Sequence, residues 1–299
     1  MSLFDRFFSG EPLNLNSDLR RNLPGRFVPL SDGICHYDLA GPEDAPLVVL
    51  VHGFSVPYFI WDPTFEFLSN AGFRVLRYDL FGRGYSERPP KTNNKAFFRR
   101  QLEELLAEVA NVSELNIVSL SMGAVLAADF ANQHPDRVAK LIFVDPAGFD
   151  LGLPWMVDAL RFPILGEVLL GMLGLFGRKS LLQSMLSDFY DPSQEALDAF
   201  VPRYLEQMKY RGFKRSILST LRSGLLDEDL AVFRALATSQ IPIQLIWGRE
   251  DKTVPFARHE LFLDLLPQTQ FHVIEKAGHI PHFERPEIVS PLLLAFLRS

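Results

Sequence analysis

The chain alternates short apolar runs with longer segments in which apolar residues recur at helical spacing. Its first third contains four short apolar runs, at residues 27–30, 34–39, 47–51 and 74–78. The first two are joined by the turn sequence Ser31-Asp32-Gly33, which predicts two connected strands. The run 47–51 consists only of Leu and Val, which is typical of a strand buried on both faces of a parallel sheet.

Helical and strand patterns then alternate. Apolar residues from Phe98 to Val109 fall on one helical face, and residues 122–134 form an Ala-rich segment that ends before Pro135. The runs 115–120 and 138–144 between and after them predict further strands. This alternation indicates an open α/β sheet with helices on both faces.

From about residue 147 to residue 238 the strand pattern disappears. Helical stripes replace it, within residues 181–189, 197–208 and 213–225. Strands are predicted again at 243–247 and 270–274, and helices at 256–266 and 286–297. We therefore predict a core formed by residues 1–146 and 239–299, and a helical cap, residues 147–238, inserted between the sixth and seventh strands.

Composition and charge narrow the possible functions. The chain has 299 residues, of which 47% are hydrophobic, so it can bury a large core. The net charge of −6 and the scattered basic residues argue against a nucleic-acid partner. Cys35 is the single cysteine, so no intrachain disulfide is possible, and no Cys/His cluster suggests a metal site. Without a recognisable signal peptide or membrane-spanning run, we expect a cytoplasmic protein.

The segment Ser119-Leu120-Ser121-Met122-Gly123 joins a predicted buried strand to a predicted helix. A sharp turn there would expose the Ser121 hydroxyl, and the helix N-terminus would place the N–H of Met122 beside a developing oxyanion. The usual motif has glycine two residues before the serine, where this chain has Ser119. The alternative is that Ser121 only caps the helix.

The order of the following polar residues favours a nucleophilic Ser121. Asp251 follows the strand 243–247, and His279 follows the strand 270–274. Serine, acid and histidine in this order, each after a parallel strand, are expected for a catalytic triad in which His279 is the base. Glu250 competes with Asp251 for the acid, and His282 competes with His279 for the base. Asp145, which ends the strand before the insertion, is a further alternative acid.

A second oxyanion donor should come from the loop after the strand 47–51, which reads His52-Gly53-Phe54. Gly53 permits a tight turn, so we expect the N–H of Phe54 to face the site. His52 comes too early in the chain to be the base, and we expect it to shape this loop.

Together these segments resemble the α/β-hydrolase family, of the serine esterase or lipase type. The resemblance is carried by residues 52–54, 79–86, 119–123, 247–251 and 278–279. It implies an eight-stranded, mostly parallel sheet, a helical cap between strands six and seven, and hydrolysis without a cofactor. Haloalkane dehalogenases and epoxide hydrolases carry aspartate at this position, so Ser121 argues against their reactions. Leu120 is neither the Asn usual in carbon–carbon bond hydrolases nor the His usual in monoacylglycerol lipases, so the subfamily stays open.

The predicted cap is rich in apolar residues, notably between Trp155 and Phe176. Most of them can form the core of the cap, and others can line an acyl pocket or contact a membrane surface. We therefore expect a small lipophilic ester as substrate, such as an acylglycerol or a medium-chain ester. The alternatives are a carbon–carbon bond hydrolase of ring-fission products, a thioesterase or lactonase, and a non-enzymatic ligand-binding protein. The oligomeric state is not predicted.

Overall fold

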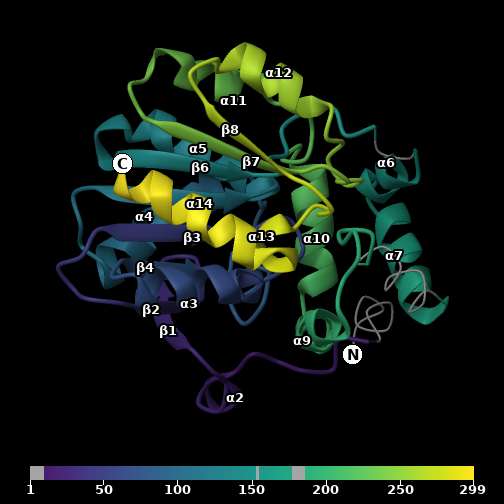
Figure 1. The fold of residues 1–299 in the computed structure, drawn as a ribbon. Coiled ribbons are helices and arrows are strands. Elements are labelled where there is room, and N and C mark those ends of the chain that lie inside the picture. The colour runs from purple at the N-terminus through teal and green to yellow at the C-terminus, as the bar shows by residue number, and fades with distance from the viewer. Residues whose placement is uncertain (1–9, 153–154, 177–185) are drawn as a thin grey trace.

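The computed structural model describes residues 10–152, 155–176 and 186–299. One eight-stranded sheet crosses the molecule in the order β1-β2-β4-β3-β5-β6-β7-β8 (Figure 1). The strands are β1 (Arg26–Leu30), β2 (Gly33–Ala40), β3 (Leu47–Val51), β4 (Arg74–Tyr78), β5 (Leu115–Leu120), β6 (Val138–Val144), β7 (Ile243–Gly248) and β8 (Gln270–Ile274). Strand β2 pairs antiparallel with β1 and β4, and the pairs from β4 through β8 are parallel. The predicted fold class is confirmed.

Helices cover both faces of the sheet. Strand β3 shows why, because Val49 and Val51 belong to one apolar cluster and Val48 and Leu50 to the other. The first cluster packs against α4 (Lys95–Val109), α5 (Met122–Gln133) and α12 (Arg258–Leu265). The second packs against α3 (Asp62–Asn70) and α14 (Pro286–Arg298) (Figure 1). A strand with apolar residues at every position therefore contributes to two cores.

The regular secondary structure in the described parts of the segment between β6 and β7 is mainly helical. The helices are α6 (Trp155–Arg161), α7 (Leu165–Phe176), α9 (Gln194–Gln207), α10 (Phe213–Arg222) and α11 (Leu230–Arg234), followed by the short helix η3 (Ala235–Thr238). Helices α6, α7, α9 and α10 gather beyond one end of the sheet (Figure 1). Residues 181–185 of the first predicted stripe lie outside the described residues, and Phe189 lies in a loop rather than a helix.

Some elements were not predicted. The short helix η1 (Tyr58–Trp61) and α3 follow β3, and α13 (Pro281–Glu284) follows the loop that contains His279. All four residues of η1 are buried, so this segment has no polar face from which a helical period could be recognised. Helix α2 (Ser17–Arg20) and the helix η2 (Pro135–Arg137) are too short to leave a pattern.

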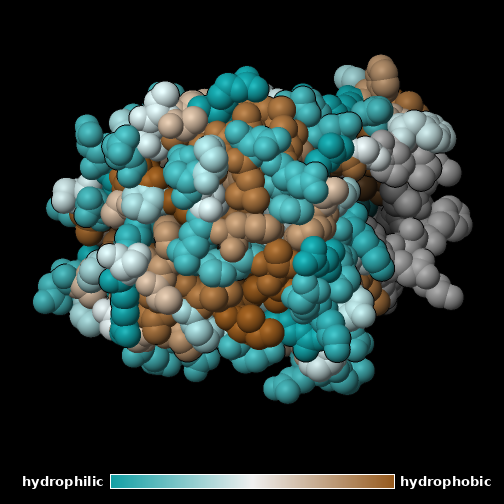
Figure 2. Space-filling model, turned by 45° about the horizontal axis from the view of Figure 1, so that its top comes forward, coloured by the Kyte–Doolittle hydropathy of each residue, from teal (hydrophilic) through white to brown (hydrophobic). Residues whose placement is uncertain are grey.

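No helix among the described residues is long and apolar enough to cross a membrane. The face in Figure 2 carries hydrophilic residues over much of its area, with smaller apolar areas between them.

Candidate active site

Ser121 lies in a strained turn between β5 and α5. Its backbone has φ 54° and ψ −123°, a conformation that residues other than glycine rarely adopt. Its N–H donates to the carbonyl of Val144 (3.0 Å), and its carbonyl accepts from the N–H of Ala147 (3.1 Å), which ties the turn to β6. The Ser121 side chain makes no capping hydrogen bond to α5. The structure thus shows the strained turn without the alternative role of Ser121 as a helix cap.

Small residues make this turn possible. A Cβ atom on Gly123 would lie 2.6 Å from the carbonyl oxygens of both Val51 and His52. A Cβ atom on Gly53 would lie 3.2 Å from Cβ of Ser121, so the loop after β3 runs directly beside the serine. Ser119 replaces the usual first glycine and is fully buried, and its hydroxyl donates to the carbonyl of Ile142 (3.1 Å). The departure at Ser119 is therefore accommodated by a hydrogen bond.

His279 and Asp251 form a buried pair at the same edge of the sheet. Nδ1 of His279 lies 2.7 Å from Oδ2 of Asp251. The other carboxylate oxygen, Oδ1, accepts the N–H groups of Thr253 (2.8 Å) and Val254 (2.9 Å), which fix the side chain. Burial opposes the protonated imidazole, but the carboxylates of Asp251 and Asp188 outweigh it, so the pKa of His279 is raised. With Nδ1 held by Asp251, Nε2 is the ring nitrogen left to accept a proton.

Glu250 and His282, the alternatives to Asp251 and His279, make other contacts. Glu250 accepts the N–H of Ala277 (3.0 Å) with Oε2 and supports the start of the His279 loop from outside. His282 is buried with its ring centroid 4.1 Å from that of Trp61, and burial lowers its pKa to about 3. Neither group takes the place of Asp251 or His279.

Two further carboxylates approach this pair. Asp145, at the end of β6, is fully buried, and its Oδ1 accepts the N–H of Gly248 (2.9 Å). Asp188 comes from the segment between α7 and α9, where its backbone carbonyl accepts the N–H of His279 (2.7 Å) and its Oδ1 accepts the hydroxyl of Thr253 (2.6 Å). The sequence offers Asp145 as an alternative acid but gives no signal for Asp188, because no strand or motif precedes that residue.

The loop with Phe54 is held by two side chains. Nδ1 of His52 lies 2.9 Å from the carbonyl of Gly53, and Nε2 accepts the N–H of Leu80 (2.9 Å). Burial lowers the pKa of His52 to about 4, so this ring is neutral and both nitrogens are engaged. The guanidinium of Arg83 donates from Nε to the carbonyl of Phe54 (2.6 Å). His52 therefore shapes the loop, as expected, and Arg83 is a support that the sequence analysis did not single out.

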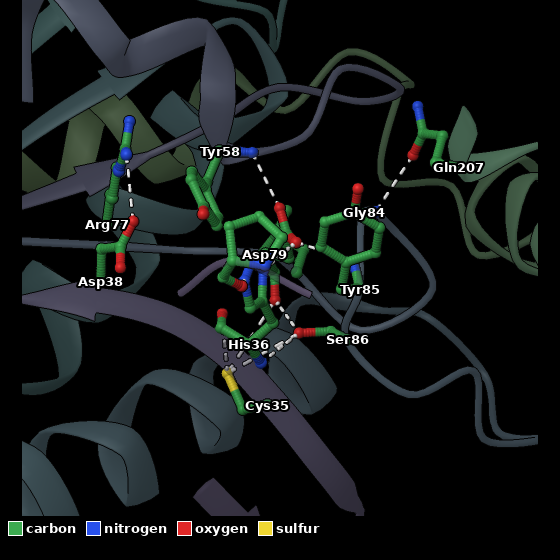
Figure 3. Close-up of polar contacts among 12 residues, drawn as sticks. Cys35, His36, Asp38, Tyr58, Arg77, Asp79, Gly84, Tyr85, Ser86 and Gln207 are labelled. Carbon is green, nitrogen blue, oxygen red and sulfur yellow. Dashed lines mark hydrogen bonds and ion pairs between the residues drawn. The ribbon is translucent and has the colours of Figure 1, made fainter. Parts of the chain in front are cut away.

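A buried polar network fastens the same region to the sheet, with Asp79 at its centre (Figure 3). Oδ1 of Asp79 accepts the N–H of Tyr58 (2.8 Å), and Oδ2 accepts the N–H of Tyr85 (2.8 Å) and lies 2.7 Å from Nδ1 of His36. Burial raises the pKa of Asp79, but the attraction of His36 and these hydrogen bonds outweigh it, so the pKa is lowered. The carboxylate thus joins the segments that follow β3 and β4.

The only described residues that bring three possible metal ligands together are Asp145, Asp251 and His279, whose ligand atoms lie within 4.8 Å of one another. In this group Nδ1 of His279 and Oδ2 of Asp251 already contact each other at hydrogen-bonding distance. The arrangement is that of a hydrogen-bonded acid–imidazole pair with a second carboxyl group beside it.

Comparison with known proteins agrees with this geometry. The family described as alpha/beta hydrolase fold matches residues 46–286, and the chain belongs to this family. A relative from Pseudomonas putida, the 2-hydroxy-6-oxononadienedioate/2-hydroxy-6-oxononatrienedioate hydrolase 1, is 26% identical over 91% of this chain and 96% of its own length.

Solved structures with the same fold include enzymes of two types. An esterase from Exiguobacterium antarcticum superposes with a TM-score of 0.75 at 19% identity, covering 92% of this chain and 100% of its own. The 2-hydroxy-6-oxo-6-phenylhexa-2,4-dienoate hydrolase from a Rhodococcus species gives a TM-score of 0.78 at 20% identity, covering 92% and 99%. At these identities the structures share the fold, and the family makes the chain a hydrolase.

Proposed function

We propose that the chain is a serine hydrolase of carboxylic esters, with Ser121 as nucleophile, His279 as base and Asp251 as the acid that orients the base. The observation that supports this most is the buried contact between His279 and Asp251 at the edge where Ser121 occupies its strained turn. Ser121 and Asp145 follow the paired strands β5 and β6, and Asp145 lies beside Asp251 and His279.

The proposed reaction follows from these positions. Ser121 Oγ attacks the ester carbonyl carbon while Nε2 of His279 takes the hydroxyl proton, and Asp251 stabilises the imidazolium. The carbonyl oxygen becomes an oxyanion beside the N–H groups of Phe54 and Met122. Met122 is the first residue of α5, where backbone N–H groups have no acceptor within the helix. The imidazolium then protonates the leaving alcohol, and water hydrolyses the acyl-enzyme by the same steps.

We propose a lipophilic acyl group, such as that of an acylglycerol or a medium-chain ester. Trp155, Phe162, Ile164 and Leu165, on or beside α6 and α7, have exposed fractions of 45% to 78%. Such side chains would gain contact with an acyl chain or a lipid surface, and each buried methylene contributes about 0.8 kcal/mol. We expect kcat/KM for p-nitrophenyl esters to rise from acetyl to octanoyl, and an unchanged or falling series would contradict the proposed acyl group.

The curated relatives favour a second candidate, the hydrolysis of carbon–carbon bonds in ring-fission products. The relative from Pseudomonas putida and one from Comamonas testosteroni, 25% identical over 90% of this chain, are hydrolases of such compounds. The same serine, base and oxyanion donors would serve both reactions. Incubation with a vinylogous diketone, followed by loss of its absorbance, distinguishes this candidate from the first.

The decisive experiment is labelling with a fluorophosphonate, which reacts only with an activated serine. We expect the wild type to be labelled at Ser121, and Ser121→Ala and His279→Ala to remain unlabelled while keeping the circular dichroism spectrum of the wild type. Labelling at another serine, or none in the folded wild type with and without detergent, would refute the proposed nucleophile.

A further inference from the structure

Three aspartates from different parts of the fold surround His279. Asp251 follows β7, Asp145 ends β6, and Asp188 comes from the segment between α7 and α9. One oxygen of Asp145, one oxygen of Asp251 and one ring nitrogen of His279 all lie within 4.8 Å of one another. The proposed triad uses only one of these carboxyl groups, so the other two need an explanation.

Hydrogen bonds distinguish Asp145 from Asp251. The carboxylate of Asp251 has three donors: the N–H groups of Thr253 and Val254 at Oδ1 and Nδ1 of His279 at Oδ2. Asp145 receives one N–H, that of Gly248, at Oδ1. Its Oδ2 is buried and receives no hydrogen bond from an N–H group of the described residues. The carboxylate of Asp251 lies beside Asp145, so a proton on this oxygen would have Asp251 as its acceptor.

Two ionised carboxylates at this distance, both removed from water, repel each other strongly, and one of them is expected to hold a proton. Asp251 has the donors that stabilise a negative charge, so the proton belongs on Asp145. The charged groups that face Asp145 are Asp251, Asp188 and His279, and no lysine or arginine among the described residues makes an ion pair with it. Burial first, and then the charge of Asp251, raise the pKa of Asp145 well above its usual value.

We propose that Asp145 is protonated in the resting protein and donates a hydrogen bond from Oδ2 to the carboxylate of Asp251, so that it acts as a positioning residue for the Asp251–His279 pair. The inference rests on the proposed function of that pair. The proton lets Oδ2 of Asp145, a buried oxygen that lacks a hydrogen-bond partner among the described residues, donate to Asp251, which gains a fourth donor. It also keeps Asp145 from adding its own negative charge beside Asp251, whose carboxylate stabilises the imidazolium when that forms.

The substitution Asp145→Asn tests this directly. An asparagine keeps an acceptor for the N–H of Gly248 and presents an amide N–H where the carboxylic O–H stood. We therefore expect kcat/KM for the best ester to stay within about threefold of the wild type. The pKa on the acidic side of the kcat/KM–pH profile should move by less than about 0.3 pH units. An ionised Asp145 predicts the opposite, because its loss would lower the pKa of His279 by about one unit or more.

Asp145→Leu has the same backbone but supplies neither donor nor acceptor. It leaves the N–H of Gly248 without its partner, and we expect kcat to fall by about tenfold or more. A leucine variant as active as the asparagine variant would show that Asp145 does not position the pair.

Infrared spectroscopy gives a measurement that does not depend on turnover. In protein labelled with ¹³C-aspartate, a protonated carboxyl group of an aspartate shows a carbonyl band that shifts in ²H₂O. We expect this band at neutral pH in the wild type and in Asp188→Asn, and its loss in Asp145→Asn. Asp188 is the matched control, because burial raises the pKa of that carboxyl group as well.

The outcomes separate this inference from the proposed function. Absence of the band in the wild type, or its loss in Asp188→Asn instead of Asp145→Asn, overturns the inference even when Ser121 is labelled. Presence of the band with an unlabelled Ser121 supports the protonated Asp145 and refutes the proposed nucleophile.

Discussion

Replacement of Arg83 tests whether the loop with Phe54 is held in place by a buried cation. Arg83 is fully buried, and among the described residues its donors reach only neutral oxygens: the carbonyl of Phe54 (2.6 Å) and the hydroxyls of Ser216 (2.6 Å) and Thr220 (2.9 Å). Burial lowers its pKa to about 9. The guanidinium thus joins the loop beside Ser121 to helix α10.

The expected loss of stability in Arg83→Met follows from the hydrogen bonds that each of the three acceptors keeps. The hydroxyl of Ser216 still accepts from Asn93 Nδ2 (2.6 Å), and that of Thr220 still donates to the carbonyl of Ser216 (3.0 Å). The carbonyl of Phe54 loses the donor that Arg83 provides. One orphaned buried carbonyl costs about 1–3 kcal/mol, and removal of a buried cation offsets part of this. We expect the free energy of unfolding to fall by about 1–2 kcal/mol in urea denaturation.

The catalytic effect should exceed the effect on stability. Because Phe54, whose carbonyl Arg83 holds, also supplies the N–H of a proposed oxyanion donor, we expect kcat to fall by about tenfold to a hundredfold with little change in KM. Arg88→Met is the matched control: Arg88 is also buried, but it donates to the carbonyls of Gly84 and Ser86 and not to Phe54. Its loss should destabilise the fold and leave kcat within about threefold. Equal losses of kcat in the two variants would refute the reasoning.

Three further predictions concern the base, the turn and the loop of the base. Because the pKa of His279 is raised and the base must be neutral, kcat/KM should fall with decreasing pH through an inflection above 6.5, and an inflection below that value would contradict the assignment. Gly123→Ala should abolish fluorophosphonate labelling because its Cβ meets two carbonyl oxygens at 2.6 Å. Gly152→Ala, whose Cβ meets no atom of the described residues within 4 Å and whose cost comes from its φ of 58°, should lower stability by only about 1 kcal/mol in thermal denaturation. Glu284 accepts the N–H groups of Tyr190, Asp191 and Gly278, so Glu284→Ala should speed hydrogen exchange at these amides, and unchanged exchange would show that the side chain does not hold the segment.

Much of the sheet could be predicted because each of its central strands is buried on both sides. The run Leu47–Val51 has no polar residue, and it became β3 with all five residues buried. Helix η1 could not be predicted from the sequence. Tyr58–Trp61 is wholly buried, so its apolar residues show no helical period. A period of apolar residues identifies a helix or strand only when one of its faces is exposed to solvent.

The order of serine, acid and histidine, and the strands before them, were determined by the sequence alone, since each follows a recognisable apolar run. Only the tertiary structure decided which neighbouring side chain points inward. Glu250 and Asp251 are adjacent, yet one supports Ala277 from outside and the other contacts His279, because the turn after β7 directs them apart. The packing of distant segments also brought Asp145 and Asp188 to His279. Such contacts depend on through-space distances between elements, which local patterns along a chain do not encode.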